Sequence, residues 1–232
     1  MPAAEDRRPP TFRLLIVPGV TVDKWSRVWS ERLPEVDLRV TPTEHAQLGP
    51  LLSEQADAGL VRLPVDQDIF HAIPLYTEAT VVVFSRDHQL AGAEDELSLA
   101  DLAGQTLTQP LDDVLDWTGA SAAPATEHRP ATTASAVEFV AASVGVMLVP
   151  QSLARLHNRR DLAYRVVTDA PQSSVALVWR RDRQTELVEE MIGIVRGRTA
   201  NSTRGRAPAP SAESAKKSGH RRGAPNPRRG KR

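Results

Sequence analysis

Residues 12–21 read FRLLIVPGVT, and this stretch shows how the chain builds its elements. The apolar run 12–17 predicts a buried strand, and the pair Pro18-Gly19 that follows predicts a turn. Apolar residues then recur every three or four positions, which predicts a helix over 22–32. A strand, a turn and a helix in this order form the repeating unit of α/β proteins.

The same alternation continues to about residue 196. Residues 77–85 form a continuous β-branched run that is typical of one strand buried on both faces. The spacing predicts an α/β fold with mainly parallel sheets. The remaining expected strands are 36–40, 58–63, 106–109, 146–149, 162–167 and 174–180, and the remaining expected helices are 43–58, 136–143, 151–157 and 185–196.

Start signals support several of these helices. Thr21 or Asp23 can cap the helix over 22–32, because both side chains accept hydrogen bonds from free N–H groups. Ser98 with Asp101, and Ser135 with Glu138, have the spacing of a capping box. Gly49-Pro50 should kink or split the helix expected over 43–58.

Composition excludes several classes of chemistry. The 232 residues contain no Cys, which removes disulfides, thiolate metal sites and a Cys nucleophile. The formal net charge of zero hides an asymmetry: residues 200–232 hold ten Lys and Arg against one Glu (+9), and the rest holds nineteen against 28 acids (−9). We expect a disordered leader over 1–11 and a disordered basic tail over 199–232, since neither has apolar residues to bury.

No sequence motif indicates catalysis or a membrane. The apolar runs are far shorter than the roughly 18 residues that a membrane span needs, and no signal peptide is present, so we expect a cytoplasmic protein. The HExxH, P-loop, GxGxxG and Gly-x-Ser-x-Gly patterns are absent, so we expect no enzyme activity and no cofactor. Asp112, Asp113 and Asp116 lack the Gly and Glu of a calcium loop, which favours a solvated acidic loop and no metal.

Six stretches, taken in order, resemble a known family. Together they are similar to the effector-binding domain of LysR-type transcriptional regulators, which has the fold of type 2 periplasmic binding proteins. The resemblance covers about 12–198. The stretches are FRLLIV (12–17), ADAGLV (56–61), IPLYTE (73–78), RDHQLA (86–91), SLADLA (98–103) and VGVMLVP (144–150).

The resemblance implies a two-lobed fold with a ligand cleft where the chain crosses between the lobes. Lobe I would comprise 12–84 and 169–198, and lobe II would comprise 85–168, with crossings near 84–85 and 167–169. Regulators of this family carry an N-terminal winged helix-turn-helix of about 60 residues, for which the 11 residues before the first expected strand leave no room. We therefore expect a stand-alone sensor domain, or one that works with a partner.

The resemblance also places candidate ligand-binding residues. In the family, backbone and hydroxyl groups at helix N-termini face each other across the cleft, and such groups favour an anionic ligand. Thr21 and Ser135 can instead serve only as caps, Arg62 can form an exposed salt bridge, and Gln109 can be a loop amide. The candidates are Gly19, Val20, Thr21, Arg62, Thr108, Gln109, Thr133 and Ser135.

Two interpretations of function remain open. The first is a non-enzymatic module that binds a small anionic metabolite in transcriptional regulation. The second is an interaction protein with a vestigial cleft that forms a homodimer or pairs with a regulator; we assign Trp25 and Trp29 to core or dimer packing and not to a ligand stack. In that case its tail would contact nucleic acid without sequence preference, or only keep the chain soluble. The paired basic residues of the tail are Lys216, Lys217, Arg221, Arg222, Arg228 and Arg229.

Overall fold

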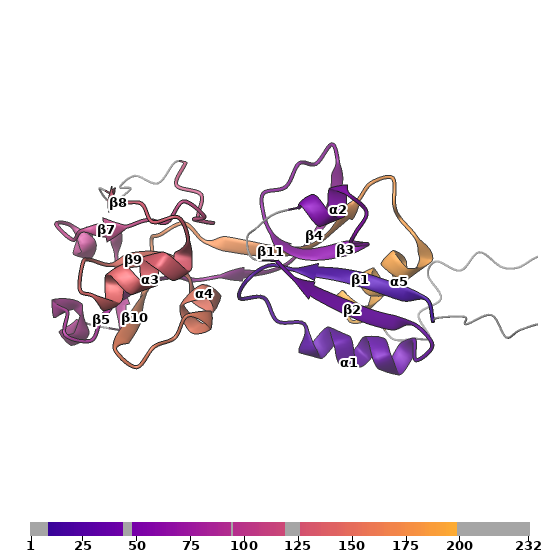
Figure 1. Ribbon diagram of the computed structural model, residues 1–232, viewed down its shortest axis with the longest axis horizontal. Coiled ribbons are helices and arrows are strands. Elements are labelled where there is room, and N and C mark those ends of the chain that lie inside the picture. Colours follow the sequence, from indigo (N-terminus) through magenta and orange to yellow (C-terminus); the bar gives the residue numbers. More distant parts are fainter. Residues whose placement is uncertain (1–8, 44–47, 94, 119–125, 199–232) are drawn as a thin grey trace, which may run out of the picture. The chain divides into compact units, whose positions relative to one another are not determined.

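The computed structural model of the chain describes residues 9–43, 48–93, 95–118 and 126–198 (Figure 1). Within these ranges, two mixed sheets form the centres of two lobes. Sheet order in lobe I is β2-β1-β3-β11-β4, and sheet order in lobe II is β6-β10-β5-β9. The expected leader lies outside the described residues except for its last three positions. The expected tail lies entirely outside them.

Lobe I is built from both ends of the described chain. Helices α1 and α2 lie on opposite sides of its sheet, and α1 contacts α5 (Figure 1). Its elements are β1 (Thr11–Ile16), α1 (Asp23–Arg32), β2 (Asp37–Pro42), α2 (Gly49–Leu52), β3 (Ala58–Arg62), β4 (Phe70–Glu78), β11 (Ser173–Arg180) and α5 (Glu186–Val195).

Lobe II is one continuous stretch of the chain. Its sheet is covered by the helices α3 and α4, and β7 and β8 form a small second sheet. Its elements are β5 (Thr80–Ser85), η1 (Gln89–Gly92), β6 (Glu96–Leu97), η2 (Leu99–Leu102), β7 (Leu107–Thr108), β8 (Thr126–His128), α3 (Thr133–Ala141), β9 (Met147–Pro150), α4 (Gln151–Leu156) and β10 (Leu162–Val167).

An aromatic stack anchors α1 to the sheet of lobe I. The rings of Phe12 and Trp29 lie 4.8 Å apart, and Trp29 Nε1 donates to the carbonyl oxygen of Val36 at 3.0 Å. Trp29 is 1% exposed, which confirms it as a core residue, whereas Trp25 is only partly buried. Burial of these two rings fixes the position of the helix that follows the first turn.

The prediction of mainly parallel sheets was wrong. β1 pairs in parallel with β2 and β3, but β11 is antiparallel to both β3 and β4. In lobe II, β5 is antiparallel to β9 and β10. The reason is that β11 comes from the C-terminal part of the chain and inserts between two earlier strands, a long-range pairing that local periodicity does not report.

The chain first crosses between the lobes at Ala79, not near Phe84 and Ser85. β4 ends at Glu78 in the sheet of lobe I, and β5 starts at Thr80 in the sheet of lobe II. The β-branched run 77–85 therefore covers the end of one strand and the whole of another. The chain returns to lobe I between β10 and β11, where the Thr80 hydroxyl donates to the carbonyl oxygen of Pro171.

Two of the three predicted helix starts differ from the structure. α1 begins after Val22 without a side-chain cap, so neither Thr21 nor Asp23 caps it. α3 is capped by Thr132, whose hydroxyl accepts from the N–H of Ser135, so Ser135 lies inside the helix and starts no capping box. The capping box of Ser98 is confirmed, although it opens a 3-10 helix.

The helix expected over 43–58 is reduced to the four residues of α2. Pro50 stands at the start of this helix, where its missing N–H costs nothing, and does not kink a longer one. Glu54 then adopts a positive φ of 60°, which ends the turn. Residues 44–47 lie outside the described part of the chain.

Within the described ranges, no helix has both the length and the hydropathy needed to cross a membrane.

Gly145 is required where α3 turns into β9. Its φ is +143°, and a Cβ at this position would lie 2.4 Å from the carbonyl oxygen of Thr106, which accepts from Val146 N–H. We expect Gly145→Ala to lower the free energy of unfolding by about 2 kcal/mol or more, because the clash is with backbone. Urea denaturation followed by circular dichroism measures the change.

Gly49→Ala is the matched control for this prediction. A Cβ at Gly49 meets nothing within 4 Å, so this variant should be neutral or stabilised by up to about 1 kcal/mol. Equal losses in the two variants would contradict the role given to Gly145.

Candidate ligand-binding cleft

The lobe I wall of the candidate site is formed by the carboxyl ends of its parallel strands. β1, β2 and β3 run in the same direction, so Ile16, Pro42 and Arg62 end at one edge of the sheet. In open α/β sheets, ligands bind outside this edge. The Pro18-Gly19 turn extends the wall beyond β1.

The lobe II wall is formed by the first turn of α3 and by one side of α4. A cleft of about 540 Å³ lies between the two walls. That volume is within the range of small-molecule sites. The cleft is lined by Ile16, Val17, Pro18, Gly19, Val20, Pro42, Thr43 and Arg62 from lobe I, and by Asp112, Val114, Thr132, Thr133, Ala134, Leu153, Leu156 and His157 from lobe II.

Arg62 is a buried ion-pair partner, and neither interpretation of it from the sequence was complete. Its side chain is 3% exposed, and its Nη2 lies 3.0 Å from Oε2 of Glu78, whose side chain is 9% exposed. The guanidinium also donates to the carbonyl oxygen of Pro18 at 2.8 Å and to the hydroxyl of Ser152 at 2.9 Å. An exposed salt bridge is therefore excluded, and an internal carboxylate already balances the charge of the arginine.

Four of the eight candidate residues line the cleft: Gly19, Val20, Arg62 and Thr133. They come from three chain-distant segments, which the fold brings to one place. That they contact a ligand stays a prediction.

The other four candidates lie away from the cleft lining. Thr21 is exposed, and Ser135 lies one residue beyond the α3 positions that reach the cleft. Thr108 is fully buried and its hydroxyl has no partner among the described residues. Gln109 donates from Nε2 to Asp113 at 2.6 Å, which is the loop-amide role considered above.

Sequence reasoning missed several lining residues. Pro42 and Thr43 end a strand parallel to β1, so the rule of the carboxyl edge could have found them. Asp112 and His157 had no such signal, because they reach the cleft only through packing within lobe II. Asp112 Oδ1 accepts from the hydroxyl of Thr133 at 2.9 Å, which ties the loop to the start of α3.

The acidic loop is organised by Asp113. This carboxylate accepts from the indole N–H of Trp117 at 2.9 Å as well as from Gln109 and from the backbone N–H of Leu115. Asp116 accepts from Thr118 in the same way. In the described ranges, no group of three His, Asp or Glu side chains could hold a metal ion.

His157 is a titratable group of the lobe II wall whose pKa is changed by its environment. Partial burial lowers the pKa of His157 below its ordinary value, and the nearby negative charge of Asp112 opposes that shift. The imidazole is therefore neutral at pH 7, where it offers one donor and one acceptor to the cleft.

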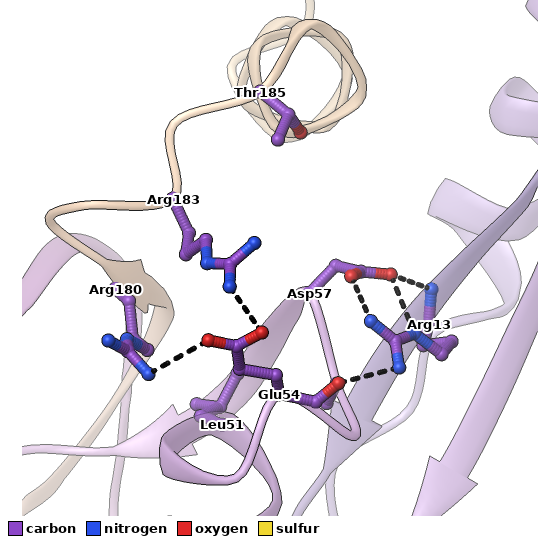
Figure 2. A pocket seen from close by; sticks show the side chains of 8 residues that line it. Arg13, Leu51, Glu54, Asp57, Arg180, Arg183 and Thr185 are labelled. Carbon is purple, nitrogen blue, oxygen red and sulfur yellow. Dashed lines mark hydrogen bonds and ion pairs between the residues drawn. The ribbon is translucent and has the colours of Figure 1, made fainter.

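A second cavity lies at the other end of the lobe I sheet, and ion-paired side chains line it (Figure 2). Arg13 binds both oxygens of Asp57, at 2.5 and 3.1 Å, and donates to the carbonyl oxygen of Glu54. The carboxylate of Glu54 faces Arg180 and Arg183. The cavity is only about 70 Å³, so we assign it a structural role in joining α2 to the loop before α5.

Two α/β lobes that exchange the chain twice and enclose a cleft define a ligand-binding domain of the periplasmic-binding-protein type. The comparison with protein families specifies which one. Residues 17–200 match the LysR substrate binding domain, and the chain belongs to this family.

Two relatives of known designation are similar in sequence. A probable hydrogen peroxide-inducible genes activator of Mycobacterium avium is 32% identical over 178 residues, covering 72% of this chain and 57% of the relative. A protein of the same designation from Mycobacterium leprae (strain TN) is 33% identical over 142 residues, covering 57% and 45%. The chain thus spans about half the length of these relatives.

Solved structures share the fold. The BenM effector binding domain with its effector benzoate superposes with a TM-score of 0.68 at 18% identity, covering 81% of this chain and 91% of that one. The reduced form of OxyR gives 0.65 at 21% identity, covering 84% and 98%. These similarities confirm the predicted two-lobed fold.

The burial of Arg62 generates a stability prediction. We expect Arg62→Ala to lower the free energy of unfolding by about 3–5 kcal/mol, because it leaves Glu78 charged and unpaired in a buried site. Urea denaturation measures the loss. Arg159→Ala is the control: it removes a side chain that binds Glu138 and Asp161 at the surface, where water screens the pairs, so its effect should be much smaller. Similar losses would contradict the burial argument.

The environment of His157 generates a pH prediction. Its pKa is lower in the folded than in the unfolded chain, so the unfolded chain binds more protons once the pH falls below about 6.5, the ordinary value. Relative to His157→Asn, the wild type should therefore lose stability as the pH is lowered from 8 to 5. Paired melting curves measure this difference.

Asp112→Asn provides a second check on the sign. Removing the opposing negative charge should lower the pKa of His157 further, so the loss of stability that starts near the unfolded pKa should continue to lower pH and become larger. If the wild type instead became more stable relative to His157→Asn as the pH fell toward 5, the lowered pKa of His157 would be contradicted.

Proposed function

We propose that this chain is the effector-sensing part of a LysR-type transcriptional regulator, that it is not an enzyme, and that it acts in the cytoplasm. A small molecule bound in the cleft would contact both lobes at once. Ligand binding would then favour the closed arrangement by as much as the ligand prefers that arrangement over the open one.

The composition of the cleft lining carries this proposal. Apolar side chains from both lobes, among them Val17, Val20, Val114 and Leu153, provide surface for an apolar ligand body. Polar groups are few and lie at defined places, which is how such sites orient a ligand.

The polar groups favour a ligand with one anionic group. Thr133 and Ala134 stand in the first turn of α3, where backbone N–H groups have no carbonyl of the helix to bind. The buried Nε of Arg62 has no hydrogen-bond partner among the described residues. Asp112 lies on the same wall and disfavours a second negative charge. A monocarboxylate fits this arrangement better than a dicarboxylate.

The designation of the mycobacterial relatives raises peroxide as an alternative signal. A thiol response to peroxide needs a reactive cysteine, and these 232 residues contain none. Met147 and Met191 are at most 1% exposed, so their oxidation would require the core to open. We therefore favour a bound small molecule over peroxide as the signal read by this part of the chain.

The basic stretch 200–232 supports a second role that the sequence alone suggests. Ten Lys and Arg in this stretch favour salt-dependent contact with nucleic acid phosphates. Pairing with a second copy or with a regulator would place the sensor near its target. Both remain predictions that add to ligand binding and do not replace it.

A thermal-shift screen tests the proposed function. Small monocarboxylates, matched dicarboxylates and neutral analogues are added to the full chain, with hydrogen peroxide as a separate arm. A monocarboxylate at about 100 times its Kd should raise the melting temperature by roughly 5–10 °C, because it binds only the folded state. Titration calorimetry on the best compound then gives the stoichiometry.

Ala134→Phe is the variant that links the result to the cleft. Ala134 is an exposed lining residue at the start of α3, so a phenyl group there should fill the cleft and abolish the shift. Ala100→Phe, on the exposed side of η2, is the matched control and should leave it intact. A shift that survives Ala134→Phe, or a response to peroxide alone, would contradict the proposal.

A further inference from the structure

We propose that Ser152 is a positioning residue that sets how far the two lobes open. It lies in α4 of lobe II and is not among the residues that line the cleft. The inference concerns the contact between the lobes, so it does not depend on whether a ligand binds.

The crossing segments alone leave the lobes free to rotate. The first crossing is the single residue Ala79 and the second is the short segment 168–172, and the Thr80–Pro171 hydrogen bond joins these two crossings to each other. Something beyond the crossings must therefore hold the walls of the cleft at a defined separation.

Ser152 contacts lobe I through a donor that has two further partners in lobe I. Its Oγ accepts from Nη2 of Arg62 at 2.9 Å. Arg62 is held from two other directions, by the carbonyl oxygen of Pro18 and by the carboxylate of Glu78. Because the guanidinium cannot follow a moving partner, rotation of lobe II away from lobe I breaks this hydrogen bond.

The same serine also limits closure. Gly19 has a φ of +82°, and a Cβ built there would lie 2.6 Å from Oγ and 3.1 Å from Cβ of Ser152. The backbone of the lobe I turn is therefore already in contact with α4. Only glycine allows this approach, and further closure would press the turn against the serine.

The position of Ser152 determines the position of the lobe II wall. Leu153 and Leu156 follow it on the same short helix, His157 is the C-cap of that helix, and all three line the cleft. The backbone N–H of Gln151 donates to the carbonyl oxygen of Ala79 at 3.0 Å, which anchors the start of the helix at the first crossing. Ser152 then fixes the rotation of the helix about that anchor.

The distance between two spin labels, one on each lobe, tests this role. Because the chain has no native Cys, Lys24→Cys on α1 and Ala100→Cys on η2, both at exposed positions, label one site on each lobe. Electron–electron double resonance on the full chain measures the distribution of distances. Ser152→Ala should broaden it and shift the ratio of open to closed molecules about tenfold, the effect of losing one hydrogen bond to a charged donor.

Gly19→Ala tests the same contact from the other side. Its methyl group would displace Ser152, so the mean distance should change in this variant although every hydrogen-bonding group is kept. Ser30→Ala is the control, since its hydroxyl donates to Ser26 within α1 and touches one lobe only. Distributions identical to wild type in both Ser152→Ala and Gly19→Ala, with both variants folded by circular dichroism, would overturn the proposal.

Discussion

The buried guanidinium of Arg62 is the interaction on which the arrangement of this molecule depends. It joins four parts of the chain: the end of β3, the turn after β1, the end of β4 at the first crossing, and α4 of the other lobe. A buried charge is tolerated only where such partners surround it. One group therefore fixes the turn, the crossing and the interlobe contact relative to one another, and a displacement of any of them displaces the others.

Much of lobe I could be predicted from the sequence, because its elements are local. Phe12–Val17, the Pro-Gly turn and the helix with Trp29 follow from apolar runs and spacing, and the structure confirms the elements there. The insertion of β11 between β3 and β4 could not be predicted, since every pair that it makes joins residues at least 95 positions apart. The crossing at Ala79 was hidden for a different reason: residues 77–85 contain no Gly, Pro, Asn or Asp that would mark a break where the chain passes from one sheet to the other.

The candidate site divides in the same way. Gly19 and Arg62 stand at strand ends of one parallel set, where a general rule places ligands, and they line the cleft. His157 and Asp112 carry no pattern of their own and reach the cleft only because lobe II folds around them. Membership of the LysR substrate binding domain family explains the scaffold but leaves the ligand to these individual side chains.

The chain leaves lobe I and returns to it at one place, because the two crossing segments are joined by the hydrogen bond between Thr80 and Pro171. The stretch between them is uninterrupted, and it supplies half of the cleft lining. An inserted unit of this kind can be exchanged between relatives as a whole, provided that the crossing and the Ser152 contact with lobe I are preserved. New ligand preferences can then arise in evolution by replacing one wall of the cleft while the other wall, with its arginine and its glycine turn, stays unchanged.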